Sequence, residues 1–368
     1  MLYAIKGHSF TSEGWAVLLE PRDVVDGPVL LLPIHARSQS SLVQLGSQHV
    51  LDQFFDFARR RHQIYLDRQA GKPFPWSPDP IFQQYRFTNV FRELDATTIW
   101  FRENVRERYD GDDVATLLST VVFRLFNRIT TGEAIFCQEM FNVENGQTET
   151  PFETFLRTGV AEDMREGIMT MCGSGPYCTG SYIINSPNGM DKLTGVLWMI
   201  QQVRDEMDDV LDVIYESNRA LGVLRETWDR LRQFPHIADF TSYEIVTDLR
   251  HTKLMGHAKD HMTWANPGPG AMRGLNRIHG RPLNKKLKKD DFVAEMRDLL
   301  AKSRSEQYWP QHSYNDTYVK FQGVDLDIPV SDWPTMEMRD IEHTLCEFDK
   351  YMRTKLGEGR PRGKFNHR

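Results

Sequence analysis

Cysteine is scarce in this sequence, with four residues in a chain of 368. They stand at Cys137, Cys172, Cys178 and Cys346, which is too few and too scattered for a disulfide framework, so a reducing compartment such as the cytoplasm fits better. Cys172 and Cys178 have no second pair to complete a zinc site, and the spacing supplies no four-cysteine iron–sulfur ligand set. We therefore expect a protein that carries no metal and no other cofactor.

Long apolar runs and a positive net charge are also missing. No stretch of about 18 apolar residues occurs, and the segment from Met1 to Phe10 has no apolar core behind a basic start. These absences predict a protein without a membrane span, located in the cytoplasm. The formal net charge of −6 argues against indiscriminate binding to nucleic acid, which usually requires a basic domain.

The basic residues that are present cluster in two places. Seven Lys and Arg lie between Lys350 and Arg368 against one acid, Glu358, and a second group lies in the segment 281–289. Basic patches on an acidic protein are typical of a surface that grips a polyanion in one place. Solvated surface lysines and a frayed tail would explain the same pattern.

Helical periodicity runs through most of the chain. Residues 1–47 differ, because the short apolar runs at 16–19 and 29–32 are separated by Pro and Gly and predict an extended or β arm. We expect a mainly α protein in which this arm precedes a helical domain at 48–356, in one or two lobes. A flexible basic tail is expected at 357–368.

Apolar spacing assigns the individual helices. Phe54, Phe57 and Ile64 mark the first, and a proline-rich break follows at 72–80. The next helix is predicted over 86–108. Further helices are expected over 112–129, 152–171, 190–206, 208–231, 243–249, 270–278, 291–303 and 336–356.

One stretch, NPGPGAMRGL, combines glycines with arginine and predicts an anion site. Gly268 and Gly270 permit unusual dihedral angles, and the helix that follows directs its N-terminal dipole at the loop. Asn266 and Arg273 complete the predicted phosphate site, and Arg277 adds charge one helical turn further on. A tight turn between packed helices is the alternative, but it explains the glycines and not the arginines.

The last predicted helix carries two carboxylates of interest. Glu342 lies near its apolar stripe, where a carboxylate needs a partner. Asp349 is most simply explained as one half of an exposed ion pair with Arg353. The candidate partners of Glu342 are basic or amide residues: Arg86, Asn89, Arg92 and Lys350.

The run from Arg232 to Leu249 predicts two helices joined by a tight turn at 235–238. This is the pattern of a helix–hairpin–helix, whose turn offers backbone N–H groups to a DNA phosphate. His236 and Ala238 stand where glycines usually serve, so an ordinary helical hairpin is the simpler interpretation.

His257 and His261 have the four-residue spacing that places two imidazoles on one helix face, with Asp260 beside them. Gly256 and the adjacent loop weaken the helix that such a metal site would need. We expect no metal there.

Five runs of this sequence, in this order, resemble one family. It is the DNA base hypermodification group known as the alpha-glutamyl/putrescinyl thymine pyrophosphorylase family, whose module is also the helical domain associated with 5-hydroxymethyluracil DNA kinases. The resemblance covers about residues 50–365 and implies a helix–hairpin–helix DNA-glycosylase-like helical fold. The runs are YRFTNVFRELD at 85–95, VVFRLFNRI at 121–129, YEIVTDLR at 243–250, NPGPGAMRGLNRI at 266–278 and EHTLCEFDKYMR at 342–353.

The resemblance implies a role in DNA modification of the phage type. A kinase first phosphorylates 5-hydroxymethyl-deoxyuridine in DNA, and this class of protein then replaces the phosphate with an amine, giving a hypermodified thymine. The chain has no GxxxxGK[ST] motif, so the transferase step is the one expected of it. The implied partners are double-stranded DNA with a modified pyrimidine, an amino acid or polyamine, and a P-loop DNA kinase, in the host cytoplasm if the protein is phage-encoded.

That reaction needs a base for the incoming ammonium, a site for the leaving phosphate and an aromatic surface for an extruded nucleobase. The loop from Gly268 to Arg273 would bind the phosphate, and Tyr243 and Trp264 would hold the nucleobase. The candidate catalytic carboxylates are Asp248, Asp260, Glu342 and Asp349. The other residues expected to contact DNA are Arg86, Asn89, Arg92, Arg277 and Lys350.

Two alternatives remain open. The first is a DNA glycosylase or lyase that excises a modified base, and the second is a non-catalytic DNA reader that partners a DNA kinase. Glycosylases place their catalytic Asp shortly after the hairpin, at about the separation of Asp260. In the simplest alignment, however, the glycine turn itself occupies that place, which argues against cleavage of the glycosidic bond.

Overall fold

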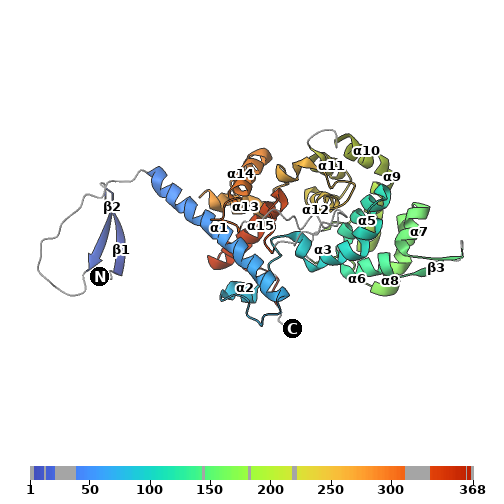
Figure 1. Ribbon diagram of the computed structural model, residues 1–368, viewed down its shortest axis with the longest axis horizontal. Coiled ribbons are helices and arrows are strands. Elements are labelled where there is room, and N and C mark those ends of the chain that lie inside the picture. The colour runs from blue at the N-terminus through green and yellow to red at the C-terminus, as the bar shows by residue number, and fades with distance from the viewer. Residues whose placement is uncertain are drawn as a thin grey trace, which may run out of the picture. The chain divides into compact units, whose positions relative to one another are not determined.

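The computed structural model describes residues 4–11, 14–20, 39–142, 146–180, 184–217, 222–310, 332–361 and 363–365. The chain divides into two units, Met1–Leu42 and Val43–Arg368 (Figure 1). In the first unit, strands β1 (Ala4–Thr11) and β2 (Gly14–Glu20) pair antiparallel, which confirms a short β-containing N-terminal arm. The apolar run at 29–32 lies outside the described residues.

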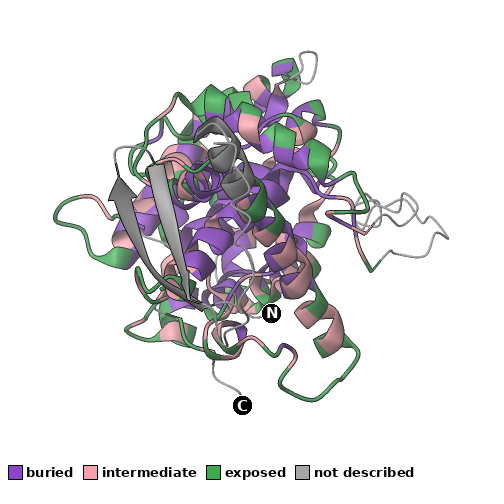
Figure 2. Ribbon diagram, turned by 90° about the vertical axis from the view of Figure 1, so that its left-hand side faces the viewer, coloured by how far each residue is buried: buried purple, intermediate pink, exposed green. Residues whose placement is uncertain are grey.

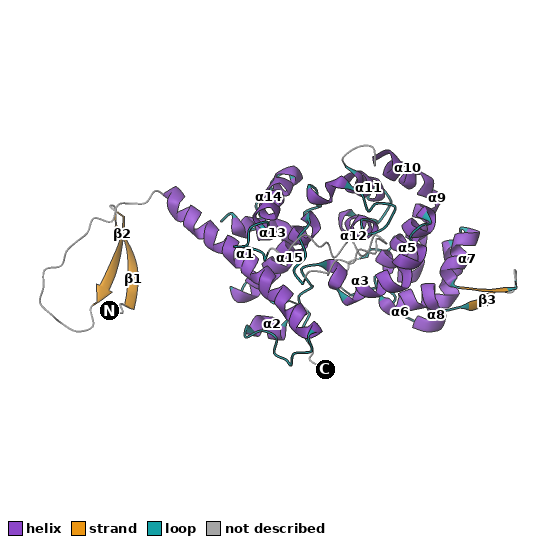
Figure 3. Ribbon diagram, in the orientation of Figure 1, coloured by secondary structure: helices purple, strands orange, loops and turns teal. Residues whose placement is uncertain are grey.

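The second unit is built almost entirely from helices, as the mainly α prediction requires (Figure 3). Its one described sheet is the short antiparallel pair β3 (Met140–Asn142) and β4 (Gln147–Glu149). The α-helices are α1 (Gln39–Gln69), α2 (Pro80–Gln84), α3 (Ala96–Phe101), α4 (Glu107–Tyr109), α5 (Asp113–Phe126), α6 (Ile129–Gly132), α7 (Pro151–Thr158), α8 (Arg165–Cys172), α9 (Lys192–Asp205), α10 (Met207–Ser217), α11 (Val223–Leu231), α12 (Asp239–Leu249), α13 (Pro269–Ile278), α14 (Lys289–Lys302) and α15 (Met338–Lys355). Shorter helical turns are η1 (Arg92–Leu94), η2 (Arg102–Arg106), η3 (Glu133–Cys137), η4 (Ala161–Met164) and η5 (Lys259–Met262).

Helix α5 is the most deeply buried helix near the site. Every residue from Ala115 to Phe126 is buried, and α5 contacts α9 and α12. The ends of this helix are set locally: the Asp112 side chain accepts a hydrogen bond from the N–H of Ala115, and Asn127 closes the helix in the left-handed conformation. Figure 2 shows the buried residues of the second unit on the inward sides of its helices.

Helices α13 and α15 make the closest contact between helices that bears on the site. Gly270 lies against Cys346, and Gly274 lies against the backbone of Leu345. A Cβ atom at Gly274 would stand 2.6 Å from the carbonyl oxygen of Leu345, a distance that packed side chains do not adopt. These two glycines therefore let the backbones approach.

The prediction of one helix over 86–108 is wrong. Residues 86–89 have no regular secondary structure and residues 90 and 91 form a bend. Helix begins at η1, continues through α3 and the π-helical turn η2, and ends at α4. Arg61 of α1 donates hydrogen bonds to the carbonyl of Phe87 and the side chain of Asn89, while the Asn89 N–H donates to Asp95. Since these groups are bonded elsewhere, they do not join a helical ladder.

Two other predicted helices are each divided into two. The helix expected over 152–171 breaks at Gly159, whose positive φ of 73° ends α7. The helix expected over 208–231 becomes α10 and α11, and the side chain of Asp260 binds the N-terminus of α11. The remaining predictions, for the first helix and for 112–129, 190–206, 243–249, 270–278, 291–303 and 336–356, are confirmed apart from their end residues.

The two chain segments at 84–86 and 363–365 pair with each other. Tyr85 and Lys364 form an antiparallel bridge, the Arg86 N–H donates to the Gly363 carbonyl, and the Phe365 N–H donates to the Gln84 carbonyl. Part of the segment expected to be a basic tail is thus bonded to the residues that lead toward η1. In the described part of the chain, no helix combines the length and apolar character needed to cross a membrane.

We predict that Gly274→Ala destabilises the protein by about 1–3 kcal/mol, because the added methyl group would force α13 away from Leu345. Alanine is intrinsically the better helix former, so a loss of stability isolates the steric effect. The measurement is the free energy of unfolding from urea titrations. Gly359→Ala is the control, since a Cβ there meets nothing within 4 Å, and a Gly274→Ala protein as stable as the wild type would contradict the prediction.

Candidate active site

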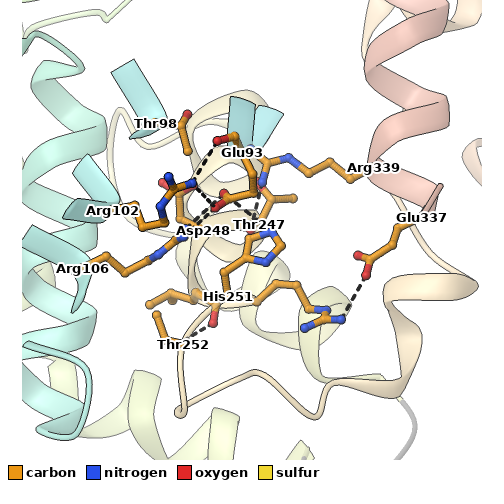
Figure 4. A network of polar contacts seen from close by, with 12 residues as sticks. Glu93, Thr98, Arg102, Arg106, Thr247, Asp248, His251, Thr252, Glu337 and Arg339 are labelled. Carbon is orange, nitrogen blue, oxygen red and sulfur yellow. Dashed lines mark hydrogen bonds and ion pairs between the residues drawn. The ribbon is translucent and has the colours of Figure 1, made fainter. Parts of the chain in front are cut away.

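A network of buried charged side chains lies between α5, α12 and the segment η1–η2. Glu93 accepts two hydrogen bonds from Arg106, at 3.1 and 2.5 Å, and Asp248 forms a two-pronged ion pair with Arg124. These four side chains are at most 3% exposed. Figure 4 shows Glu93, Asp248 and His251 close together, with Arg106 on one side and Arg339 on the other.

Two acid–base groups of this network have strongly shifted pKa values. Burial alone would raise the pKa of Glu93, but the Arg106 guanidinium brings it well below its usual value. Burial also lowers the pKa of His251 well below its usual value, so that ring is neutral at pH 7. Asp248, expected from the sequence to be a base, is placed here against Arg124. Such fully paired interior ions stabilise a particular packing of helices.

A second cluster lies where η1, α12, α13 and α15 meet, and it is centred on Glu342. One oxygen of its carboxyl group accepts a hydrogen bond of 3.0 Å from the backbone N–H of Gly268. Nearby, Arg92 and Glu244 form an ion pair of 2.8 Å. Burial raises the pKa of Glu342 to about 7, the Gly268 N–H opposes the shift, and the charge of Glu244 adds to it. Glu342 therefore exchanges a proton near neutral pH, as a general acid or base must.

Aromatic rings adjoin this carboxyl group. The ring of Tyr243 packs edge-on against Trp264, with centroids 5.7 Å apart, and Trp264 in turn lies 5.6 Å from Trp228. The Tyr243 hydroxyl is buried and has no hydrogen-bond partner within the described residues. Burial first, and then the charge of Glu342, raises the pKa of Tyr243 well above its usual value. The two aromatic residues predicted to hold a nucleobase therefore lie together, in the field of the titrating carboxyl group.

Helix α15 adds three more groups around Glu342. Arg339 donates to the carbonyl of Thr247 at 3.0 Å, and its guanidinium contributes to the potential at Glu342. The imidazole of His343 forms a short hydrogen bond with the Thr88 hydroxyl, and burial, followed by the charge of Arg92, lowers its pKa well below the usual value. Burial raises the pKa of Cys346 to about 12, with the charge of Glu342 next in weight, so it stays a thiol.

The glycine loop binds an acidic side chain of the protein itself. The N–H of Gly268 is bonded to Glu342, and Gly270 is buried against Cys346. Asn266 donates to the carbonyl of Asp239 at 3.2 Å, and its side-chain oxygen accepts from Lys289 at 3.1 Å. The Gly268 N–H, which was predicted to bind a phosphate, is therefore bonded to the carboxyl group of Glu342 in the structure.

The arginines after the loop gather around Asp349, which is fully buried. Arg273 and Arg277 donate to its two oxygens at 2.8 and 2.9 Å, and Arg353 approaches at 3.2 Å. Arg277 is itself buried and also binds Glu358, whereas Arg273 retains 36% of its side-chain exposure. Asp349 is thus an interior counter-ion, not the exposed partner that the sequence indicated.

The other predicted site residues have different surroundings. Asp260 accepts hydrogen bonds from the N–H groups of Leu224 and Arg225, at 3.1 and 3.0 Å, at the start of α11. Arg86 is exposed beside Gly363. Lys350 forms an ion pair of 2.5 Å with Glu347 and lies over the ring of Phe87. Within the described residues, no group of His, Cys, Asp and Glu side chains is placed to hold a metal ion.

Sequence reasoning missed several residues of the two clusters. Glu93, Glu244 and Arg339 belong to the quoted runs or their flanks but received no role, because charged residues at helical spacing are usually exposed. Their burial depends on contacts between segments far apart in the chain, as in the pair of Arg92 and Glu244. The only local signal was the density of charged residues within otherwise apolar helices.

Comparison with known proteins identifies the kind of domain that carries these clusters. The family model described as "5-hmdU DNA kinase, helical domain" matches residues 48–360. The chain therefore belongs to this family of helical domains, which confirms the resemblance to the helical domain associated with 5-hydroxymethyluracil DNA kinases. A "5-hmdU DNA kinase" of Bacillus phage SP10 is 25% identical over 251 residues, which cover 63% of this chain and 36% of that protein. No solved structure matches significantly.

The raised pKa of Glu342 predicts how stability changes with pH. Its pKa rises from 4.5 in the unfolded chain to about 7 in the folded protein, so the folded state holds the proton more tightly. The contribution is full below pH 4.5 and is lost as pH rises through 7, with a total of about 3 kcal/mol. Glu342→Gln should remove this loss, because the amide stays neutral and still accepts from Gly268.

Unfolding by urea at several pH values between 4.5 and 8 measures this difference. The wild type should lose stability relative to Glu342→Gln as pH rises through this range. Two curves that run parallel would show that Glu342 does not titrate near 7. Comparison with the variant cancels the contributions of all other carboxyl groups.

Proposed function

We propose that the chain is a DNA base-modifying transferase that replaces the phosphate of phosphorylated 5-hydroxymethyl-deoxyuridine in DNA with an amine. The observation that carries the proposal is the titrating carboxyl group of Glu342 between the glycine loop and a pair of aromatic rings. In the reaction, the amine nitrogen bonds to the methylene carbon on C5, and the bond from that carbon to the phosphate oxygen breaks. Inorganic phosphate leaves, and the amine loses a proton.

Glu342 accepts that proton. At neutral pH a group with a pKa of about 7 is partly ionised, so it takes a proton from an ammonium ion and passes it on to water without becoming trapped in one state. Tyr243 and Trp264, which are 4% and 9% exposed, are the aromatic residues we propose to contact a base that has left the duplex. The other three candidate carboxylates have structural roles in this scheme. Asp248 and Asp349 are counter-ions of arginines, and Asp260 caps the start of α11.

Arg273 is the residue we propose for the leaving phosphate. Its side chain is partly exposed, while the buried Arg277 keeps Asp349 paired. Arg273 can therefore turn toward a phosphate while Asp349 keeps Arg277 as its counter-ion. A cation positioned where negative charge develops lowers the barrier for departure of the phosphate.

A second function has a specific observation in its favour. The relative named "5-hmdU DNA kinase" is much longer, and this chain spans about a third of its length. The helical domain would then be a DNA reader that presents the modified base to a kinase, and Glu342 would recognise the base instead of moving a proton. If this chain alone formed an amine product, its function could not be limited to that of a DNA reader.

The first test of the transferase uses duplex DNA that contains phosphorylated 5-hydroxymethyl-deoxyuridine, with amino acids and polyamines offered as a mixture. Mass spectrometry of the released nucleosides should show an amine adduct with the wild type. Glu342→Gln should slow its formation by about 10²–10⁴-fold. Glu306→Gln, the same change at an exposed glutamate, is the control and should not alter the rate.

The outcomes of this test separate the three functions. An adduct formed at the wild-type rate by Glu342→Gln rejects the role of Glu342. Strand breaks after alkali indicate excision by a glycosylase or lyase. Unaltered DNA with every amine offered rejects the transferase.

The second test concerns Arg273. Arg273→Ala should reduce turnover on phosphorylated DNA by about 10²–10³-fold while binding to unmodified DNA changes much less, because the interaction forms as the phosphate leaves. Arg353→Ala is a matched control, since Arg353 is similarly exposed, at 38% against 36%, and contacts the same oxygen of Asp349. Equal losses in turnover and in binding, or equal effects of the two substitutions, would count against this role.

A further inference from the structure

Residues 281–289, which lead from α13 to the first residue of α14, carry a concentration of positive charge that the proposed reaction does not use. Its sequence, RPLNKKLKK, has five basic residues and no acid, in a chain whose formal net charge is −6. We call it the lysine segment. Lys285, Lys286 and Lys288 are exposed, and no ion pair joins them to the part of the protein that the structure describes.

The backbone of the lysine segment is held in place from inside. Asn276, which is fully buried in α13, donates hydrogen bonds to the carbonyls of Leu283 and Lys285, at 3.1 and 3.0 Å. The Arg281 N–H donates to the Asn276 carbonyl at 2.8 Å. Leu287 packs against the core. The segment therefore has a defined path, with Leu287 packed inward and the lysines beside it exposed to solvent.

Both ends of the lysine segment are also fixed by charged contacts. Arg281 forms a two-pronged ion pair with Glu295 of α14, at 2.5 and 2.6 Å. At the other end, the amino group of Lys289 contacts Asp239 at 2.5 Å and Asn266 at 3.1 Å. Asn266 lies two residues before Gly268, whose N–H binds the candidate catalytic carboxyl group.

These contacts give the lysine segment its direction. It begins after the C-terminal end of α13 and returns to a residue that precedes the N-terminal end of that helix. Since α13 has 10 residues, the segment covers about 15 Å. One strand of duplex DNA carries a phosphate about every 3.4 Å along the axis, so about four phosphates fall within this span.

We propose that the lysine segment is a phosphate-contacting surface that positions duplex DNA beside the candidate active site. Lysine is depleted at protein–protein interfaces and is common in contacts with nucleic-acid phosphates, and the segment exposes no aromatic side chain that would anchor a protein partner. The proposal rests on the proposed function only in taking DNA as the polyanion. Contacts of this kind set the register of the duplex without reading its sequence.

The test measures binding of a short unmodified duplex over a series of KCl concentrations by fluorescence anisotropy. The variant Lys285→Ala/Lys286→Ala/Lys288→Ala should bind more weakly, and the slope of log K against log salt should become shallower by up to about 2.7, because about 0.9 is expected per phosphate contact. A control variant removes the same charge from three other exposed lysines: Lys72, Lys259 and Lys302.

The segment is assigned to DNA if the first variant changes the slope and the control does not. Equal changes in the two variants, an unchanged slope, or a wild type that does not bind the duplex at low salt would each overturn the proposal. The proposal would also be overturned if the triple variant lost binding to polyglutamate but not to the duplex, because that result would indicate an acidic protein partner. Matching thermal unfolding midpoints check that all variants fold.

Because the probe is unmodified, this test is independent of base chemistry. If the protein binds DNA through the lysine segment but forms no amine adduct, the DNA-contacting role of the segment stands and the transferase proposal is rejected. If the protein forms the adduct and binds DNA equally well without these lysines, the transferase proposal stands and the role of the segment is rejected.

Discussion

The close approach of α13 to α15 is the contact on which the candidate site depends. With glycine at positions 270 and 274, the two backbones meet at Cys346 and Leu345. That approach brings the loop before α13 within hydrogen-bond distance of Glu342, and it brings Arg273 and Arg277 of α13 to Asp349 of α15. A side chain in the place of either glycine would separate these groups together, because they share one helix pair.

Buried carboxyl groups are treated in two ways within a short stretch of this fold. Glu93 and Asp248 each pair with a guanidinium group, and although burial alone would raise the pKa of Glu93, the Arg106 guanidinium brings it well below its usual value. Glu342 accepts a hydrogen bond from one backbone N–H, whereas Arg92 forms its ion pair with the neighbouring acid Glu244. A single dipole does not offset the loss of solvation, which is why the proton stays until about pH 7. The ability of Glu342 to exchange a proton near pH 7 thus follows from the pairing of Arg92 with Glu244.

The sequence predicted the helices that carry the site but not all of their contacts. Regular apolar spacing predicts α13 and α15, and residue type alone points to the glycine loop, Tyr243, Trp264 and Glu342, which the structure brings together. The helix expected over 86–108 was wrong because Phe87, Phe91 and Leu94 recur at helical spacing while Arg61 and Asp95 bind the intervening polar groups. Pairings between distant segments leave no periodic signal along the chain.

The bridge between Tyr85 and Lys364 gives the far end of the described chain a mechanical connection to the site. The chain after Tyr85 leads to Thr88 and Arg92, which contact His343 and Glu244. Removing residues from Gly363 onward would release one edge of that segment. An addition to the chain at this end would therefore lie next to a segment that reaches the candidate site.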